Sequence, residues 1–250
     1  GSTGEYYAQS MQERLEMASL AKDIIGNRVS LMVGTVAIRL EDSITMAEHA
    51  AKIGATSILV GSPPYAVPTE RENALNALAI DRAADLPVML YNYPGRMGVE
   101  MGREFLDRVG RSKNVIGIKE SSGSLQRAIG IATRYAGRIQ LVSGSDDIAL
   151  DFMLWGADSW ICGPANCMAQ AVCDLDRTFR AGDLVKAKAQ MATLYTAMNI
   201  LESGKFVQKL KYGCELQGTP VGECRMPLGP LTDDEKAAFA AAMQPILNWS

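Results

Sequence analysis

Lys119 is the residue in this 250-residue sequence whose position most clearly predicts chemistry. It ends an apolar run, 115–119, that is typical of a buried strand. In a parallel barrel its ammonium would lie inside, at the carboxyl end of the strand, where such folds build their active sites. A lysine amine there can attack a ketone and form an imine. Only about one lysine in a few thousand is a free amine at pH 7, so burial would have to lower its pKa. The alternative is a lysine with a buried stem and a solvated ammonium.

Tyrosine and arginine side chains occupy the loops near this lysine. Tyr91 ends the preceding strand-like run, so parallel pairing would place it beside Lys119, and Arg96 follows on a proline-containing turn. Tyr65 stands among three prolines in the loop 62–68. Rigid loops at the carboxyl rim of a barrel are where function concentrates. The structural alternative is that the two tyrosines are packing aromatics and the arginine braces a loop.

The composition argues against several other classes of protein. Lysine and arginine total 25 against 28 acidic residues, without a basic cluster, so we expect no nucleic-acid binding. The five cysteines contain no C-x-x-C pair, and His49, the one histidine, lies in a helical pattern as a solvated or helix-capping residue. Disulfide frameworks, zinc sites and Ser-His-Asp catalysis are therefore not indicated. Without an apolar span or a signal peptide, we expect a soluble, cytoplasmic protein that binds no membrane.

Strand-like runs alternate with amphipathic helical segments over most of the chain. The predicted strands are 29–34, 57–60, 87–91, 115–119, 139–143 and 159–162. The predicted helices between and around them are 10–25, 41–53, 69–84, 102–109, 125–135, 148–155 and 168–180. This alternation indicates an α/β protein with a parallel sheet. After residue 181 the strands stop, and helices are predicted at 183–201, 204–214 and 232–247. We therefore divide the chain into a barrel, residues 1–181, and a C-terminal helical extension, residues 182–250.

The six predicted strands are two fewer than a closed barrel requires. Either the sheet is open and doubly wound, or the first strand-helix-strand unit of a (β/α)8 TIM barrel, roughly 45 to 55 residues, is missing from this sequence. We favour the second interpretation because residue 1 falls inside what resembles a βα loop. A leading Gly1-Ser2 is also typical of a cloning scar.

Short motifs spread over the whole chain resemble the dihydrodipicolinate synthase and N-acetylneuraminate lyase family of class I, Schiff-base-forming lyases. They are Gly1-Ser2-Thr3-Gly4-Glu5, Pro64-Tyr65, Tyr91-Asn92-x-Pro94-x-Arg96-x-Gly98, Gly117-Ile118-Lys119-Glu120, Ser143-Gly144-x-Asp146-Asp147 and Ala165-Asn166. In that family the Gly-x-Thr-Gly-Glu loop follows the second barrel strand. The resemblance therefore supports both the barrel and the missing N-terminal segment.

The resemblance implies a cofactor-free lyase in which Lys119 forms an imine with pyruvate or a related 2-keto acid. Tyr91 would shuttle protons to and from the carbinolamine, with Thr3 or Ser2 and Tyr65 as a hydroxyl relay. Ser2 and Thr3 would also hold the carboxylate of the keto acid. In relatives the tyrosine that matches Tyr65 can cross to a neighbouring subunit, which implies a homodimer or homotetramer.

The second substrate depends on residues farther from the lysine. Arg96 resembles the family arginine that grips a carboxylate of the second substrate, which favours a dihydrodipicolinate synthase-like reaction of pyruvate with aspartate semialdehyde. Ile161, in the last predicted strand, is expected among the substrate-binding residues. The alternatives within the family are a dehydratase, a deaminase of a hydroxylated pyrroline carboxylate, and an aldolase of 2-keto-3-deoxy sugar acids. An alternative of another class is an inactive barrel used as a binding or scaffold protein.

Overall fold

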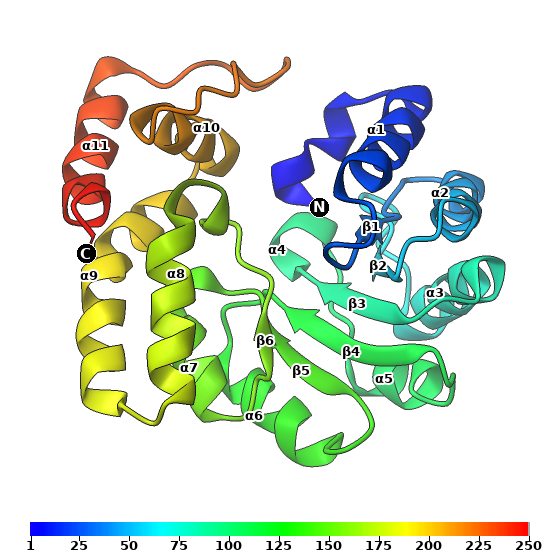
Figure 1. Ribbon diagram of the computed structural model, residues 1–250. Helices are drawn as coiled ribbons and strands as arrows, with labels where there is room; N and C mark the ends of the chain where they lie inside the picture. The colour runs from blue at the N-terminus through cyan, green and yellow to red at the C-terminus, as the bar shows by residue number, and fades with distance from the viewer. Residues whose placement is uncertain (250) are drawn as a thin grey trace. The chain divides into compact units, whose positions relative to one another are not determined.

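A single parallel sheet organises the first part of the chain (Figure 1). The computed structural model describes residues 1–249, and within them six strands lie in chain order, each paired in parallel with the next. The strands are β1 (Met32–Gly34), β2 (Ser57–Gly61), β3 (Val88–Asn92), β4 (Val115–Glu120), β5 (Gln140–Ser143) and β6 (Ser159–Trp160). The predicted α/β class, the parallel sheet and the six strands are confirmed, and the first and last strands are shorter than the predicted runs 29–34 and 159–162.

The strand order decides between the two predicted architectures. A doubly wound sheet changes direction at a switch point, so its strands do not follow chain order. The sheet described here runs from β1 to β6 without reversal, as successive strands of a barrel do. The open doubly wound alternative is therefore wrong. The described residues hold six strands, as predicted, and the missing N-terminal unit that would complete a (β/α)8 barrel stays a prediction.

Helices cover the sheet between its strands. They are α1 (Met11–Ile25), α2 (Leu40–Lys52), α3 (Glu70–Ala84), α4 (Pro94–Met97), α5 (Arg103–Val109) and α6 (Leu125–Arg134). Capping boxes begin α1 at Ser10 and α3 at Thr69, because each hydroxyl accepts a backbone N–H that the helix leaves unpaired. Consecutive helices α2, α3 and α5 lie side by side along the outside of the sheet (Figure 1).

The single histidine belongs to the packing of this layer. His49 Nε2 lies 2.9 Å from Ser19 Oγ and 3.0 Å from the carbonyl oxygen of Leu15, so the ring joins α2 to α1. It is partly buried. The expectation of a solvated histidine holds in part, since the ring is partly exposed and also contacts α1.

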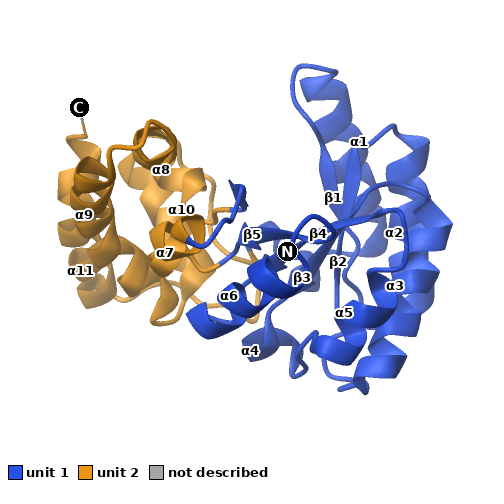
Figure 2. Cartoon of the chain, turned by 90° about the horizontal axis from the view of Figure 1, so that it is seen from below, with its two compact units in different colours: residues 1, 3–144, 155–161 blue, residues 2, 145–154, 162–250 orange. Residues whose placement is uncertain are grey.

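The chain falls into two compact units, which Figure 2 shows in different colours. The first comprises residues 1, 3–144 and 155–161, and the second comprises residues 2, 145–154 and 162–250. The second unit contains η3 (Asp146–Ile148), α7 (Ala149–Leu154), α8 (Ala165–Arg180), α9 (Leu184–Glu202), α10 (Phe206–Leu216) and α11 (Asp233–Leu247). The predicted C-terminal helices are confirmed. The domain boundary predicted after residue 181 lies within this unit, between α8 and α9.

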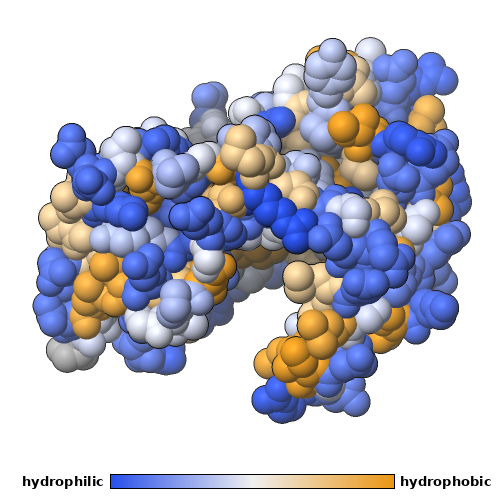
Figure 3. Space-filling view, turned by 90° about the horizontal axis from the view of Figure 1, so that it is seen from above, coloured by the Kyte–Doolittle hydropathy of each residue, from blue (hydrophilic) through white to orange (hydrophobic). Residues whose placement is uncertain are grey.

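Some large apolar side chains remain exposed. Met17, Leu20 and Ile24 follow one another along α1 and are 56%, 56% and 62% exposed. On the face that Figure 3 presents, hydrophobic residues form separate patches among hydrophilic ones. Within residues 1–249, none of the helices has both the length and the apolarity needed to cross a membrane.

Candidate active site

Lys119 and Tyr91 lie side by side at the carboxyl ends of β4 and β3. They are direct partners in the register of the two strands, and the Lys119 Nζ atom lies 4.4 Å from the centroid of the Tyr91 ring. The tyrosine is 2% exposed and the lysine is partly buried. The face of an aromatic ring attracts an ammonium, so the ring helps to hold the lysine nitrogen in one place. The predicted proximity of these two side chains is confirmed, and their catalytic roles stay predictions.

An apolar cluster surrounds the tyrosine. Leu59, Met89, Tyr91 and Val142 come from β2, β3 and β5 and are each at most 8% exposed. Ile161 packs against this cluster. The structure therefore brings Ile161 to the same face of the sheet as Tyr91, as a predicted substrate-binding residue requires.

Glycines leave space for the two reactive side chains. A Cβ atom on Gly144 would lie 2.7 Å from Lys119 Cγ and 2.9 Å from the carbonyl oxygen of Glu120, both closer than a real Cβ approaches. A Cβ on Gly1 would lie 3.3 Å from Cε1 of Tyr91. The motif glycine after β5 is thus required by the stem of the lysine, and the loop that holds Ser2 and Thr3 starts against the tyrosine ring.

The first loop forms a short 3-10 helix, η1 (Ser2–Gly4). It is closed by a hydrogen bond of 3.2 Å from the Gly4 N–H to the Gly1 carbonyl oxygen. Ser2 is partly buried and Thr3 is exposed. Whether the hydroxyl groups of Ser2 and Thr3 reach a substrate on Lys119 stays a prediction.

Arg96 stacks on a second tyrosine next to Tyr91. Its Cζ atom lies 5.2 Å from the centroid of the Tyr93 ring, and the centroids of the Tyr93 and Tyr91 rings are 6.0 Å apart. Arg96 lies on α4, a short helix that the sequence did not predict, with Pro94 at its first position and Gly98 at its end in the left-handed region (φ 74°). The four side chains Arg96, Tyr93, Tyr91 and Lys119 therefore form one row of contacting groups.

Tyr65 points away from this row. The side chain is 93% exposed, so within one chain it is not packed against Lys119. Its backbone lies in the left-handed region with φ 72°, and Val67 follows with φ 46°. Non-glycine residues in this region mark a constrained turn. The loop is thus held in a shape that presents the phenol to solvent or to another molecule.

Sequence reasoning missed Glu120, the residue directly after the lysine. Its carboxylate is fully buried and pairs with Arg127, whose Nε donates at 2.7 Å. The Asn92 side-chain amide donates to both carboxylate oxygens, at 3.1 and 2.9 Å, and the Ser122 N–H donates at 2.8 Å. The sequence did contain a signal for this residue. Strand periodicity places the charged Glu120 on the face opposite Lys119, where helices cover the sheet, so its carboxylate needs a buried partner.

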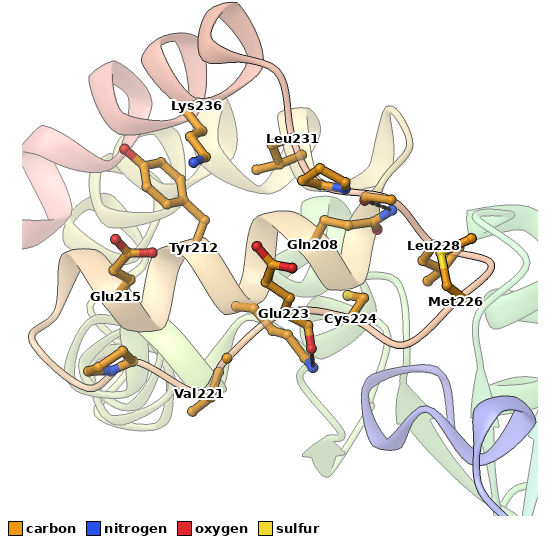
Figure 4. A pocket seen from close by; sticks show the side chains of 15 residues that line it. Gln208, Tyr212, Glu215, Val221, Glu223, Cys224, Met226, Leu228, Leu231 and Lys236 are labelled. Carbon is orange, nitrogen blue, oxygen red and sulfur yellow. Dashed lines mark hydrogen bonds between the residues drawn. The ribbon is translucent and has the colours of Figure 1, made fainter.

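A cavity in the second unit is lined by none of the predicted site residues. It has a volume of about 340 Å³ and is lined by α10, α11 and the segment 220–231 (Figure 4). Two of its lysines have contacts within the lining, because Lys211 Nζ donates to the Glu223 carbonyl oxygen at 2.8 Å and Lys236 Nζ lies 5.7 Å from the centroid of the Tyr212 ring. None of the residues that line this cavity is predicted to take part in imine formation.

The comparisons with known proteins agree with the fold. The family model described as the dihydrodipicolinate synthetase family matches residues 1–246. A 4-hydroxy-tetrahydrodipicolinate synthase from Trichlorobacter lovleyi is 33% identical over 244 residues, which cover 98% of this chain and 84% of that protein.

Solved structures show the same likeness. A dihydrodipicolinate synthase from Bacillus anthracis superimposes with a TM-score of 0.94 and 26% identity, over 98% of this chain and 84% of that chain. The chloride-inhibited dihydrodipicolinate synthase from Acinetobacter baumannii, solved in complex with pyruvate, gives a TM-score of 0.92 and 28% identity, over 97% of this chain and 84% of that chain.

Proposed function

Because the chain belongs to the dihydrodipicolinate synthetase family, we propose that it is a class I lyase that forms an imine between Lys119 and pyruvate or a related 2-keto acid. The observation that carries the proposal is the pairing of Lys119 with Tyr91, with Nζ 4.4 Å from the ring centroid. A general acid must come within hydrogen-bond reach of the group that it protonates, and this pairing brings the Tyr91 side chain next to the nucleophile.

The proposed reaction starts with attack of the Lys119 amine on the keto carbon, which gives a carbinolamine. The Tyr91 hydroxyl delivers the proton with which the carbinolamine oxygen leaves as water, and the imine forms. Loss of a proton from the neighbouring methyl carbon then gives an enamine, a carbon nucleophile. Ser2 and Thr3 hold the keto-acid carboxylate through hydroxyl and backbone N–H groups in this scheme, and Ile161 packs against its apolar side.

The second substrate in the proposal is aspartate semialdehyde, which the resemblance to the synthases of this family implies, and the Trichlorobacter lovleyi relative is named 4-hydroxy-tetrahydrodipicolinate synthase. Arg96 supports this choice, since a guanidinium can bind a carboxylate with two parallel hydrogen bonds. Turnover of pyruvate with aspartate semialdehyde is to be compared with a panel of 2-keto-3-deoxy acids and a hydroxylated pyrroline carboxylate. Higher turnover of a panel member would replace the synthase by an aldolase, dehydratase or deaminase with the same lysine chemistry.

The proposal includes a cytoplasmic homodimer or homotetramer in which Tyr65 completes the proton relay of a neighbouring subunit. Its 93% exposure supports a partner outside its own chain. The five cysteines, Cys162, Cys167, Cys173, Cys214 and Cys224, form no disulfide within the described residues, which supports a reducing compartment. Mixing subunits that carry Tyr65→Phe with subunits that carry Lys119→Ala tests the relay. Turnover should recover only in mixed oligomers if the tyrosine acts across subunits.

Borohydride reduction in the presence of pyruvate tests the central step. We expect a reduced pyruvate adduct on Lys119, located by peptide mass mapping, and no adduct in Lys119→Ala. The matched control is Lys113→Ala, because Lys113 precedes the same strand and its side chain is 84% exposed. The control should form the adduct as the parent does. Absence of an adduct in the parent, or an adduct that survives Lys119→Ala, would refute the proposed chemistry.

A further inference from the structure

The pairing of β3 with β4 contains an irregularity that makes the position of Lys119 sensitive to register. Val88 lies opposite Val115, but Met89 lies opposite Gly117, so Ile116 is an extra residue in β4. After this bulge the pairing is regular up to the end of both strands. Side chains alternate between the two faces of a sheet, so a slip of one residue would move the lysine to the opposite face.

A buried polar contact follows directly after the two reactive residues. Asn92 and Glu120 are partners in register, one position beyond Tyr91 and Lys119. The Asn92 amide donates to both oxygens of the Glu120 carboxylate, and the two side chains are 1% and 0% exposed. In a slipped register the carboxylate would lose this donor while still buried, which is energetically unfavourable. The contact between Asn92 and Glu120 therefore favours the observed register over registers shifted by one residue.

Arg127 and the segment before α5 complete a ring of contacts. The guanidinium of Arg127 binds Glu120 through Nε at 2.7 Å and Glu100 through Nη1 at 2.7 Å, and it also donates to the carbonyl oxygen of Met101. The Met101 N–H donates to Asn92 Oδ1 at 2.9 Å, which closes the ring. Buried ion pairs of this kind contribute little net stability, and selecting one register is their best-attested role.

We infer that Glu120, Asn92 and Arg127 form a register clamp that holds Tyr91 against Lys119. The clamp lies on the face of the sheet opposite the lysine, so its members are positioning residues that act through the strands. The inference rests on the proposed function only where it treats Tyr91 and Lys119 as catalytic residues. The geometry that it explains can be measured without any substrate.

The direct test is the nuclear magnetic resonance signal of the Lys119 ε-methylene group in protein labelled with 13C-lysine. Because its nitrogen lies 4.4 Å from the ring centroid of Tyr91, the signal should lie upfield of the other lysines. Its assignment comes from its disappearance in Lys119→Arg. In Glu120→Gln we expect the upfield shift to fall by at least half. Asn92→Ala, which leaves the Glu120–Arg127 pair intact, should have the same effect and provides the test if Glu120→Gln fails to fold.

Asp81→Asn is the matched control. Asp81 is 4% exposed and binds the Ser112 hydroxyl at 2.6 Å and the Asn114 amide at 2.8 Å, near the start of the same strand pair. It should lower thermal stability comparably and leave the Lys119 signal unmoved. An unshifted Lys119 signal in the parent, or a signal in Glu120→Gln and Asn92→Ala that stays at the parent position, would overturn the inference.

A kinetic readout separates this inference from the proposed function. If pyruvate forms the adduct, its rate of formation should fall about tenfold or more in Asn92→Ala, well below the melting temperature, and stay within twofold of the parent in Asp81→Asn. Equal losses of the adduct-formation rate in Asn92→Ala and Asp81→Asn would show that the clamp only stabilises the fold and does not position Lys119. If the parent shows the shifted Lys119 signal but forms no pyruvate adduct, the proposed function is refuted and the inference about the clamp still stands.

Discussion

Gly144→Ala would add a single methyl group against the stem of Lys119, and its effect can be worked out from the surrounding atoms. The new Cβ would lie 2.1 Å from Ser121 Oγ, 2.7 Å from Lys119 Cγ and 2.9 Å from the carbonyl oxygen of Glu120. The serine and lysine side chains can move aside by rotation. The carbonyl oxygen cannot, because it accepts the N–H of Gly144 itself at 3.0 Å. The strand end must therefore shift or the lysine must leave its place.

The expected loss of stability has two parts. Overpacking in a tight core costs about 1 to 3 kcal/mol, and rotation of Ser121 breaks its 2.9 Å hydrogen bond to the Gly144 carbonyl oxygen, which costs about 1 kcal/mol. The total of about 2 to 4 kcal/mol corresponds to a melting temperature lowered by about 4 to 16 °C for a domain of this size. Displacing the lysine by about 1 Å would slow adduct formation with pyruvate about 100-fold.

Two assays check this prediction, thermal unfolding by circular dichroism and the rate of borohydride-trapped adduct formation. Gly130→Ala is the control, since no atom lies within 4 Å of a Cβ built there and the residue is inside α6. Alanine is the better helix former, so the control should be stabilised by about 0.5 to 1 kcal/mol and should keep the parent rate. A Gly144→Ala protein with the parent melting temperature and rate would show that the space beside Lys119 is not tight.

Three further outcomes follow from the structure. The hydrogen bond from Tyr135, followed by nearby arginines, lowers the pKa of the Asp107 carboxyl below its ordinary value, so its contribution to stability is present above that value and is lost as the pH falls through the lowered pKa. The difference in melting temperature between the parent and Tyr135→Phe should therefore narrow below about pH 4 in a pH series. Burial raises the pKa of the Cys167 thiol to about 12. Ellman's reagent at pH 8 should therefore label the exposed Cys173 at once and the buried Cys167 only after unfolding. In Cys173→Ser the fast labelling should be lost. Thr232→Ala removes the capping box of α11 and should cost about 1 kcal/mol, seen as a melting temperature lowered by about 2 to 4 °C.

The repeating part of the fold could be predicted because its signals are local. Apolar runs that end at Tyr91 and Lys119, separated by one amphipathic segment, require adjacent parallel strands and hence adjacent side chains. The structure confirms this pairing. The helix starts at Ser10 and Thr69 were equally predictable, because a capping box is a pattern of only four consecutive residues.

The remaining features depend on contacts between distant residues. The extra residue at Ile116 changes which residues of β3 and β4 face each other, and neither strand shows this by itself. Glu120 was missed because its three partners come from β3, the turn after β4, and α6. The length of α4 depends on how the chain leaves β3. The closed barrel was inferred from the position of residue 1 in a βα-like loop and from the family resemblance, and the described residues provide six of its strands.

The neighbouring, tilted rings of Tyr91 and Tyr93 also give the protein an optical property. Their centroids are 6.0 Å apart and their planes are inclined by 48°, so their electronic transitions couple in a chiral arrangement. One end of the pair faces the Lys119 nitrogen and the other faces the Arg96 guanidinium. A change of charge at either end alters the field at the rings and therefore the near-ultraviolet circular dichroism. The chain thus contains an intrinsic, label-free reporter for ligand binding at both ends of the row.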